Sequence, residues 1–519
     1  MLNGHLKVKL SGDAVSILMD GWCDKRVSAS SWGSDGLALS TPEFRATLIL
    51  LDGAMPAVFD ELVSSGDLPN IGRIVLETGE SVPATTSFPS TTGVAYLPFL
   101  TGCYPGSCNV PGIRWLDSER YQGDWWKGRQ HVRSYCSHQG PLLNSDLPEA
   151  MPSLFDIEQS SVVLCSPFTR NLTQQRIRTS LARAALGSTA HFARTYKWLD
   201  RAVARDLATV ARERFRFVFA VFPGVDGLAH SYDPKHPKVL NLYREFDSAI
   251  GSYARSGGVD GEHLLVIVSD HGMSRIDRHT DVSVELERRG LRVLRHPLIW
   301  RRNPQLAVMV SGNASAQVYL QPGVSRTHRW SIPAIEDGVV KGIPSDLVEW
   351  LANLEGIALV AGVDDEDVVV VSRAGRARLT DLGNGDIGYM PETADVLELG
   401  GSTIAKHERD WLADSISGRF PDSPMQLIQL FRSSRTGDLV VSASEHADLR
   451  EDWELPEHRS GHGALTHDHM RCLVAANREL AGPMRSVDVF PAILNHLGHE
   501  IPAGIDGCYS GSSVVPQPI

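Results

Sequence analysis

The sequence predicts an α/β fold with a mainly parallel central sheet, and three observations support this prediction. Short, largely apolar runs recur along the chain, as expected for strands buried on both faces; they are Ala46–Leu51, Phe215–Phe222 and Leu264–Val268. Helical patterns lie between these runs, and strands that alternate with helices are typical of a parallel sheet. An aspartate follows each run closely, which suggests that one edge of the sheet carries chemistry.

Length and composition limit the possible classes of protein. The 519 residues exceed one ordinary core, and 42% hydrophobic with 22% charged residues is typical of a globular chain. The formal net charge of −12 argues against a protein that coats nucleic acid or binds membranes through a polybasic surface. An anionic substrate would therefore need a local positive centre, and a bound metal is the simplest one.

No signal peptide or transmembrane segment is visible in the sequence. Residues 1–7 lack the apolar region of a signal peptide, and no stretch is long and apolar enough to span a bilayer. The seven cysteines are odd in number and irregularly spaced, which favours reduced thiols over a disulfide framework. We therefore expect a cytoplasmic protein without a transmembrane segment.

Changes in pattern divide the chain into four predicted segments. These are an N-terminal extension (1–45), a first part of the α/β core (46–303), an inserted α+β cap of short β-like runs (304–441) and a second part of the core (442–519). Between 105 and 150 lies a long stretch with little periodicity, and a loop of that length is usually functional.

The other predicted elements complete this scheme. Helices are expected at Pro56–Leu76 with a break at Ser64–Asp67, at Ser90–Leu100 with Gly102 as C-cap, within Thr179–Arg214, at His236–Tyr253 and from Ser486 onward; strands are expected at Val15–Met19, Ala316–Leu320, Val368–Val371 and Leu439–Val441, and an extended stretch at Ser81–Pro89. Ser90 or Thr91 would be the N-cap of its helix, and a helix N-terminus is also a natural seat for phosphate.

Three carboxylates are predicted to meet at the edge of the sheet. Asp52, Asp226 and Asp270 follow the three apolar runs, and parallel strands share their carboxyl ends. Three uncompensated carboxylates would repel one another, so that some would have to be protonated unless a cation lies between them. The alternative is that each aspartate merely caps a turn.

Three histidines accompany these acids. His230 lies four residues after Asp226, a spacing that brings both side chains to one face of a helix. His271 adjoins Asp270, and His462 precedes a glycine far along the chain. Three aspartates and three histidines fit two zinc-type sites, although manganese or iron also accepts such ligands.

Together these motifs resemble the alkaline phosphatase superfamily, specifically its type I phosphodiesterase/nucleotide pyrophosphatase branch. The resemblance covers about 46–280 and 459–507. It implies an alkaline-phosphatase-like core with two divalent metal ions, most simply zinc. One ion would be held by Asp52, Thr92, Asp270 and His271, and the other by Asp226, His230 and His462.

The same resemblance implies a threonine nucleophile. Family members place it four residues after the Phe and nine before the Thr-Gly of a segment that here runs from Phe88 to Gly102, and both counts select Thr92. Thr91 and Ser90 are the alternatives. The chain departs from the family pattern at Gly93, where many members carry Phe-Pro-Asn. The family's phosphate-binding Asn has its nearest counterpart in Asn109, and a backbone N–H is the alternative.

A segment from Tyr121 to Tyr135 combines aromatic and cationic side chains. Trp125, Trp126 and Arg133 suit a nucleobase, sugar or lipid headgroup beside a phosphate. Alternatively, the tryptophans pack the cap onto the core.

The expected function is therefore a two-metal hydrolase of phosphate esters. We expect it to cleave phosphodiester or pyrophosphate bonds of a small-molecule substrate through a phospho-threonine intermediate. The alternatives are a phosphomonoesterase or phosphonate hydrolase of the same superfamily, a phosphomutase, or a metal-binding protein without catalysis.

Overall fold

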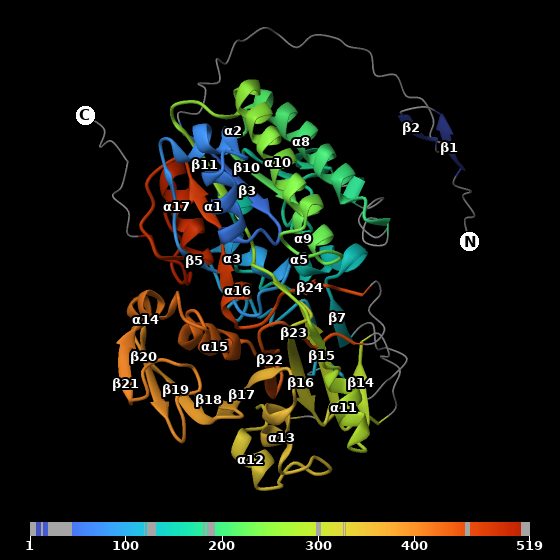
Figure 1. The fold of residues 1–519 in the computed structure, drawn as a ribbon, viewed down its shortest axis with the longest axis vertical. Coiled ribbons are helices and arrows are strands. Elements are labelled where there is room, and N and C mark those ends of the chain that lie inside the picture. The colour runs from blue at the N-terminus through green and yellow to red at the C-terminus, as the bar shows by residue number, and fades with distance from the viewer. Residues whose placement is uncertain are drawn as a thin grey trace. The chain divides into compact units, whose positions relative to one another are not determined.

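The computed structural model describes residues 7–11, 14–18, 44–118, 120–121, 131–179, 182–183, 193–296, 303–324, 326, 328–451 and 457–509. The chain divides into two compact units, Met1–Thr41 and Pro42–Ile519. In the first unit, β1 (Lys7–Ser11) pairs antiparallel with β2 (Ala14–Leu18), close to the predicted strand. All other elements belong to the second unit (Figure 1).

A seven-stranded sheet forms the core of the second unit, in the order β4-β26-β11-β3-β10-β8-β9. Its centre is β3 (Arg45–Leu51), which pairs parallel with both β10 (Phe217–Phe222) and β11 (His263–Val268). The parallel array continues through β8 (Ser161–Leu164) and β9 (Ile177–Arg178), and β26 (Val474–Ala476) is antiparallel to β11. The predicted α/β class and mainly parallel sheet are confirmed.

Helices cover both faces of this sheet, because successive strand residues point to opposite sides. Leu48 and Leu50 of β3 pack in one apolar cluster with α3 (Leu97–Thr101) and α17 (Val489–Leu497). Ile49 of β3 packs in a second cluster, together with residues of α1 (Pro56–Ser64), α8 (Tyr196–Glu213) and α10 (Pro237–Tyr253). The core strands are therefore buried on both sides, as the apolar runs predict.

A second sheet of nine strands lies beside the core, in the order β14-β15-β16-β22-β17-β18-β19-β20-β21 (Figure 1). It begins with β14 (Val293–Arg295), and its fourth strand, β22 (Leu439–Ala443), comes from the end of the segment. The predicted limits of the insertion, 304 and 441, thus fall inside the span of this sheet. The division into core and cap stays a prediction.

The remaining elements comprise the other strands of the two sheets and the segments that connect the layers. They are α2 (Pro69–Ile71), η1 (Gly72–Leu76), β4 (Glu80–Ser81), β5 (Ala84–Thr85), η2 (Val94–Tyr96), β6 (Arg114–Leu116), β7 (Val132–Ser134), η4 (Ser137–Leu142), α5 (Leu143–Asp146), α6 (Leu154–Ile157), η5 (Gln174–Arg176), α9 (Gly224–Ala229), η6 (Ala254–Gly258), β12 (Ser274–Arg275), β13 (Arg278–His279), α11 (Val282–Arg288), β15 (Leu306–Ser311), β16 (Ser315–Leu320), α12 (Ile332–Glu336), α13 (Leu347–Asn353), β17 (Ile357–Asp364), β18 (Asp367–Ser372), β19 (Gly375–Gly383), β20 (Asp386–Pro391), β21 (Ile404–His407), α14 (Glu408–Ser415), α15 (Ser423–Arg432), β23 (Ala447–Asp448), β24 (Ser460–Gly461), α16 (His467–Met470), β25 (Arg471–Cys472), β27 (Met484–Arg485) and η7 (Ser486–Asp488).

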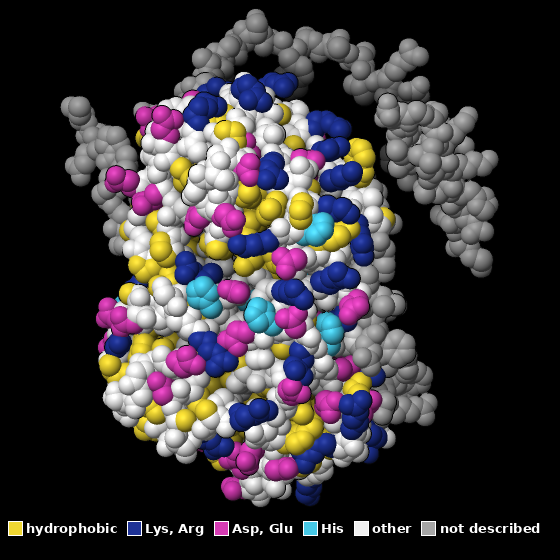
Figure 2. Space-filling model, in the orientation of Figure 1, with side chains coloured by type: hydrophobic (Ala, Val, Ile, Leu, Met, Phe, Trp, Pro, Cys, Tyr) yellow, Lys and Arg dark blue, Asp and Glu magenta, His cyan; other side chains and the backbone are white. Residues whose placement is uncertain are grey.

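Two further observations concern the distribution of charge on the surface and the length and polarity of the helices. On the face drawn in Figure 2, basic and acidic side chains are interspersed over most of the second unit. Among the described residues, every helix is too short or too polar to cross a membrane.

Candidate metal centre

The three predicted aspartates meet where β3, β10 and β11 end. The backbone N–H of Asp52 donates to Phe222 O at 3.1 Å, and that of Asp226 donates to Asp52 O at 3.0 Å. Gly53 N donates to Asp270 Oδ1 at 3.1 Å. Gly53 has a φ of +68°, and a Cβ there would lie 2.8 Å from Asp226 Cβ. The close approach of the acidic side chains therefore requires glycine at this turn.

Two groups of side chains in this pocket have the geometry of metal ligands. One consists of Asp52, Asp270 and His271, and the other of Asp226, His271 and His462; within each group the potential ligand atoms lie within 4.8 Å of one another. His230 Nε2 lies 3.3 Å from Asp226 Oδ1, at the edge of the second group. The structure thus brings together all six predicted side chains, with His271 between the two groups.

Backbone carbonyls orient the three histidines. A carbonyl oxygen can only accept a hydrogen bond, so each Nδ1 carries the proton and each Nε2 offers its lone pair to the centre. The pairs are Nδ1 of His230 with Ser460 O at 2.9 Å, Nδ1 of His271 with Gly272 O at 3.0 Å, and Nδ1 of His462 with Ser90 O at 2.8 Å. Such contacts are typical of metal-binding histidines.

The charges of the pocket also suit cations. Burial, followed by the charges of Asp270 and Asp226, holds the pKa of Asp52 well above its usual range, and burial raises the pKa of Asp270. Burial also acts to raise the pKa of Asp226, but His230, His462 and His271 outweigh this effect and lower it. Asp226 Oδ1 and Asp270 Oδ2 are buried and have no hydrogen-bond partner in the described part of the chain. These orphaned oxygens fit a divalent cation.

Thr92 lies against the first group. Its Oγ1 is 3.3 Å from Asp52 Oδ1, to which it donates, and 3.0 Å from His271 Nε2. Gly93 follows with a φ of +84°, and a Cβ there would meet no atom within 4 Å. The turn at Gly93 thus presents Thr92 to the acids and leaves open space beside it.

The predicted helix at Ser90–Leu100 is wrong at its start. The first helical turn is η2, which begins at Val94, and α3 follows it. Ser90 does not cap this helix: its Oγ donates to Ala464 O at 3.2 Å and accepts from Gly463 N at 3.1 Å. A tertiary contact to the segment of His462 has replaced the local cap. The C-cap at Gly102, with a φ of +68°, is as predicted.

The residues predicted to contact substrate have other partners or lie outside the described residues. Asn109 Oδ1 accepts from Ser433 Oγ at 2.8 Å, next to α15. Arg133, in β7, forms an ion pair with Asp146 at 3.1 Å. Their role in substrate binding remains a prediction. Trp125 and Trp126 lie outside the described residues.

Several residues beside the centre were not predicted from the sequence. Tyr96 donates from its hydroxyl to Asp52 Oδ2 at 2.6 Å, and its position four residues after Thr92 is a helical spacing that could have indicated this contact. The ring of His458 packs on that of His230 at a centroid distance of 4.3 Å, and Asn313 Nδ2 lies 2.5 Å from His458 Nδ1. No local signal in the sequence places Asn313 here.

Asn313 belongs to the turn between β15 and β16, which reaches the centre from the second sheet. It forms an isolated parallel β-bridge with His462, and Ala314 N donates to His462 O at 3.1 Å. A Cβ on Gly312 would lie 2.6 Å from Thr91 Cγ2 and 3.0 Å from His462 Nδ1. The second sheet therefore supports both the histidine and the threonine loop directly.

Comparisons with known proteins give one family and a set of similar folds. The family model described as type I phosphodiesterase/nucleotide pyrophosphatase matches residues 46–330. No curated protein sequence matches the chain.

Solved structures include similar folds at low sequence identity. Phosphonoacetate hydrolase from Sinorhizobium meliloti 1021, in complex with phosphonoformate, is 17% identical with a TM-score of 0.53, over 88% of this chain and 96% of that one. Human ectonucleotide pyrophosphatase/phosphodiesterase 5 is 12% identical with a TM-score of 0.53, over 89% and 97%. Its murine counterpart, an inactive threonine-to-alanine variant in complex with AMP, is 11% identical with a TM-score of 0.50, over 88% and 96%. At these identities the likeness establishes a shared fold.

Proposed function

Because this chain belongs to the type I phosphodiesterase/nucleotide pyrophosphatase family, as its motifs predicted, we propose that it is a two-metal hydrolase acting through Thr92. Family membership indicates a phosphoester hydrolase with the alkaline-phosphatase-like fold. The finer proposal is that it cleaves phosphodiester or pyrophosphate bonds of a small molecule through a phospho-threonine intermediate.

One observation carries this proposal. Thr92 Oγ1 lies within hydrogen-bond distance of both Asp52 and His271, two members of a candidate ligand group, while the open space beside Gly93 leaves room for a substrate. A nucleophile in hydrogen-bond reach of an acid and an imidazole is the arrangement that covalent phosphoryl transfer requires.

We assign the two ions to Asp52, Thr92, Asp270 and His271, and to Asp226, His230 and His462. When bound, divalent cations supply positive charge that lowers the pKa of a hydroxyl and stabilises the anionic transition state. Zinc is the metal we propose, given carboxylate and imidazole ligands. The Thr92 oxygen would form a bond to phosphorus as the leaving oxygen departs, and water would then cleave the Thr92–phosphorus ester.

The chain's other residues would keep this geometry in place. Tyr96 holds one oxygen of Asp52, and the carbonyls of Ser90, Gly272 and Ser460 hold the three imidazoles in their orientation. Positioning of this kind before the reaction is the main contribution that a protein makes to phosphoryl transfer.

The test is a matched pair of isosteric variants. Thr92→Val should lower turnover of bis(4-nitrophenyl) phosphate by at least about 10³-fold, because the nucleophilic oxygen is lost. Thr91→Val removes a buried hydroxyl that has no hydrogen bond in the described structure, and it should keep most of the activity. Acid quenching during turnover should leave phosphate on the peptide that contains Thr92.

Full turnover by Thr92→Val, with the metal content unchanged, would refute the nucleophile assignment. Comparing the zinc-loaded enzyme on a nitrophenyl diester, a nitrophenyl monoester, a dinucleotide pyrophosphate and a phosphonate would decide the substrate class. Monoester turnover above that of the diester would favour the phosphomonoesterase alternative.

A further inference from the structure

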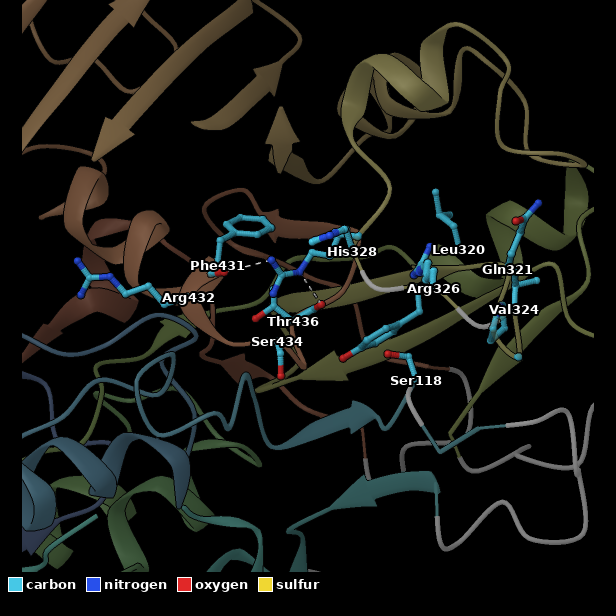
Figure 3. Close-up of a pocket in the computed structure, with 14 residues that line it drawn as sticks. Ser118, Leu320, Gln321, Val324, Arg326, His328, Phe431, Arg432, Ser434 and Thr436 are labelled. Atoms are coloured by element: carbon cyan, nitrogen blue, oxygen red, sulfur yellow. Dashed lines mark hydrogen bonds between the residues drawn. The ribbon is translucent and has the colours of Figure 1, made fainter. Parts of the chain in front are cut away.

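A second cavity lies in the described structure away from the candidate ligands. It has a volume of about 600 Å³ and is bounded by the end of β16, the segment after it, and the end of α15 (Figure 3). A volume of this size is typical of small-molecule sites. None of its lining residues is a candidate metal ligand.

The lining of this cavity is cationic. It includes Arg326, Arg329, Arg432 and His328, and no Asp or Glu is among the described residues that line it. Ser118 adds a hydroxyl from the segment after β6, and Figure 3 shows its side chain at the side of the cavity opposite His328. Such a lining disfavours a cation and favours an anion.

Arg329 forms no direct ion pair with an acid in the described part of the chain, although the charge of Asp438 acts on it. Its guanidinium donates to three backbone carbonyls, those of Thr436 at 3.0 Å, Phe431 at 3.1 Å and Ser433. In the part of the chain that the structure describes, no carboxylate forms an ion pair with it. A guanidinium stays protonated even where burial lowers its pKa, as it does here. Arg326 and Arg329 therefore share the single carboxylate of Asp438, which leaves a net positive charge at the wall of the cavity.

Arg326 offers an unused donor. Its Nη2 pairs with Asp438 Oδ2 at 2.6 Å, but its Nη1 is buried and has no hydrogen-bond partner among the described residues. Asp438 also accepts from the backbone N–H groups of Leu320 and Trp330, and these bonds hold its carboxylate in place. Asp438 is not among the described residues that line the cavity. An unsatisfied buried donor is costly unless a ligand or water completes it.

Arg432 differs from these two. In Figure 3 its side chain points away from the other labelled residues, and its guanidinium pairs with Asp381 at 3.1 Å and Asp506 at 3.4 Å. Its charge is therefore compensated outside the cavity. Arg432 is therefore a suitable control for Arg326, because it is another arginine that lines the same cavity.

From this arrangement we propose that the cavity binds a small organic anion through a phosphate-type group held by Arg326 and Arg329. The oxyanion accepts from Arg326 Nη1 and the Ser118 hydroxyl, next to the charge of Arg329. The rings of Tyr319 and Phe431, which also line the cavity, receive the organic part. This site goes beyond the proposed hydrolase function and does not depend on it.

The test uses the full-length protein stripped of metal by a chelator, with inorganic phosphate as the probe at constant ionic strength. Without cations, the three carboxylates of the metal centre repel phosphate, so calorimetry reports the cavity. We expect saturable binding with a Kd below about 1 mM. Arg326→Lys should weaken it at least tenfold, since lysine keeps the charge opposite Asp438 but loses the Nη1 donor.

The control Arg432→Gln should change the affinity less than twofold. Binding that is absent from the wild type, or equal losses in Arg326→Lys and Arg432→Gln, would overturn the proposal. If Arg326→Lys does not fold by circular dichroism, Ser118→Ala replaces it and should weaken phosphate binding about threefold, because the proposed hydroxyl donor is lost. Because no substrate or metal is present, the result is independent of hydrolysis.

Discussion

The imidazole rings of His271 and His462 are stacked, with centroids 3.6 Å apart and planes 8° from parallel. His271 follows β11, which pairs with the central strand β3, whereas His462 comes after the entire second sheet in the sequence. Burial, followed by the charge of His271, holds the pKa of His462 well below its usual range. In both rings Nδ1 lies against a backbone carbonyl, Gly272 O and Ser90 O respectively, so that both Nε2 atoms remain available. The two candidate metal sites therefore meet at the His271–His462 contact. We expect a substitution at one site to alter metal binding at the other.

Removal of metal should destabilise the protein, and the Asp270→Asn variant should show whether Asp270 is a ligand of that metal. Metal at 100 times its Kd stabilises the folded state by about 2.7 kcal/mol per site, so the melting temperature should fall on chelation. Asp270→Asn should lose much of this metal-dependent gain. In chelator it should be as stable as the wild type or more so, because the charge of Asp270 raises the pKa of Asp52.

Differential scanning fluorimetry with zinc and with chelator checks this prediction. Asp277→Asn is the control, since Asp277 is an exposed acid paired with Arg275 at 2.8 Å. A metal-dependent shift that is the same in Asp270→Asn and Asp277→Asn would contradict the assignment of Asp270.

Loss of the Tyr96 hydroxyl should weaken the site that contains Asp52. The bond from Tyr96 to Asp52 Oδ2 lowers the pKa of that carboxyl, so Tyr96→Phe should raise it and reduce zinc affinity about tenfold. Competition with a chromophoric chelator measures the affinity. Tyr104→Phe removes another buried hydroxyl, one without a hydrogen bond in the described structure, and should leave zinc binding unchanged. Equal zinc affinities in Tyr96→Phe and the wild type would rule out this positioning role.

The positions of the three aspartates could be predicted from the apolar runs that precede them and from the rule that parallel strands end at one edge of a sheet. Asp52 follows its apolar run directly and Asp270 follows its run after one serine, and parallel strands bring their carboxyl ends to one edge. Asp226 was placed by the same rule, and its spacing to His230 by the helical period. The structure brings these side chains into two groups that share His271, with Thr92 against the group of Asp52.

What the sequence could not predict depends on contacts between distant segments. The bond from Ser433 Oγ to Asn109 Oδ1 joins two segments far apart in the sequence, and the role predicted for Asn109 in phosphate binding is not tested by it. The place of β22 in the second sheet was not predicted, because it pairs with β16 and β17, which lie far from it in the sequence. The start of the helix after Thr92 was missed because Gly93 has a positive φ, which no apolar pattern reveals.

The turn between β15 and β16 should tolerate no side chain at its glycine. Gly312 has a φ of +60°, and a Cβ there would collide with Thr91 and His462. Gly312→Ala should therefore lower both activity and metal affinity, and should cost more than the 1–2 kcal/mol, roughly, of left-handed backbone strain. Gly383→Ala is the matched control, since Gly383 has a φ of +79° and open space around its Cβ position.

Urea unfolding and phosphodiesterase assays of the two variants distinguish two effects. Both variants have left-handed backbone strain, whereas only Gly312→Ala has a steric clash with Thr91 and His462. We expect Gly383→Ala to lose stability but keep its activity per folded molecule. If Gly312→Ala behaves identically to Gly383→Ala, the turn does not support the centre.

The stability of the protein should fall with acid partly because of His263. This side chain is fully buried in β11, with Nε2 2.9 Å from Thr47 Oγ1, and burial lowers its pKa from 6.5 to about 3, with a smaller contribution from Arg45. The unfolded chain therefore binds a proton between these pH values that the folded chain excludes. The resulting stability is fully present above pH 6.5 and is lost as the pH falls toward 3, at up to about 1.4 kcal/mol per pH unit.

The measurement is the free energy of unfolding in urea at pH 7, 6 and 5, in chelator so that loss of metal does not contribute. Other buried groups also titrate, and the raised pKa of Asp52 acts in the opposite direction, so the comparison is with His263→Gln. Since glutamine does not titrate, the variant should lose about 1 kcal/mol less than the wild type between pH 6 and 5. Parallel pH profiles for the two proteins would show that His263 is solvated or protonated in the folded state, contrary to its burial.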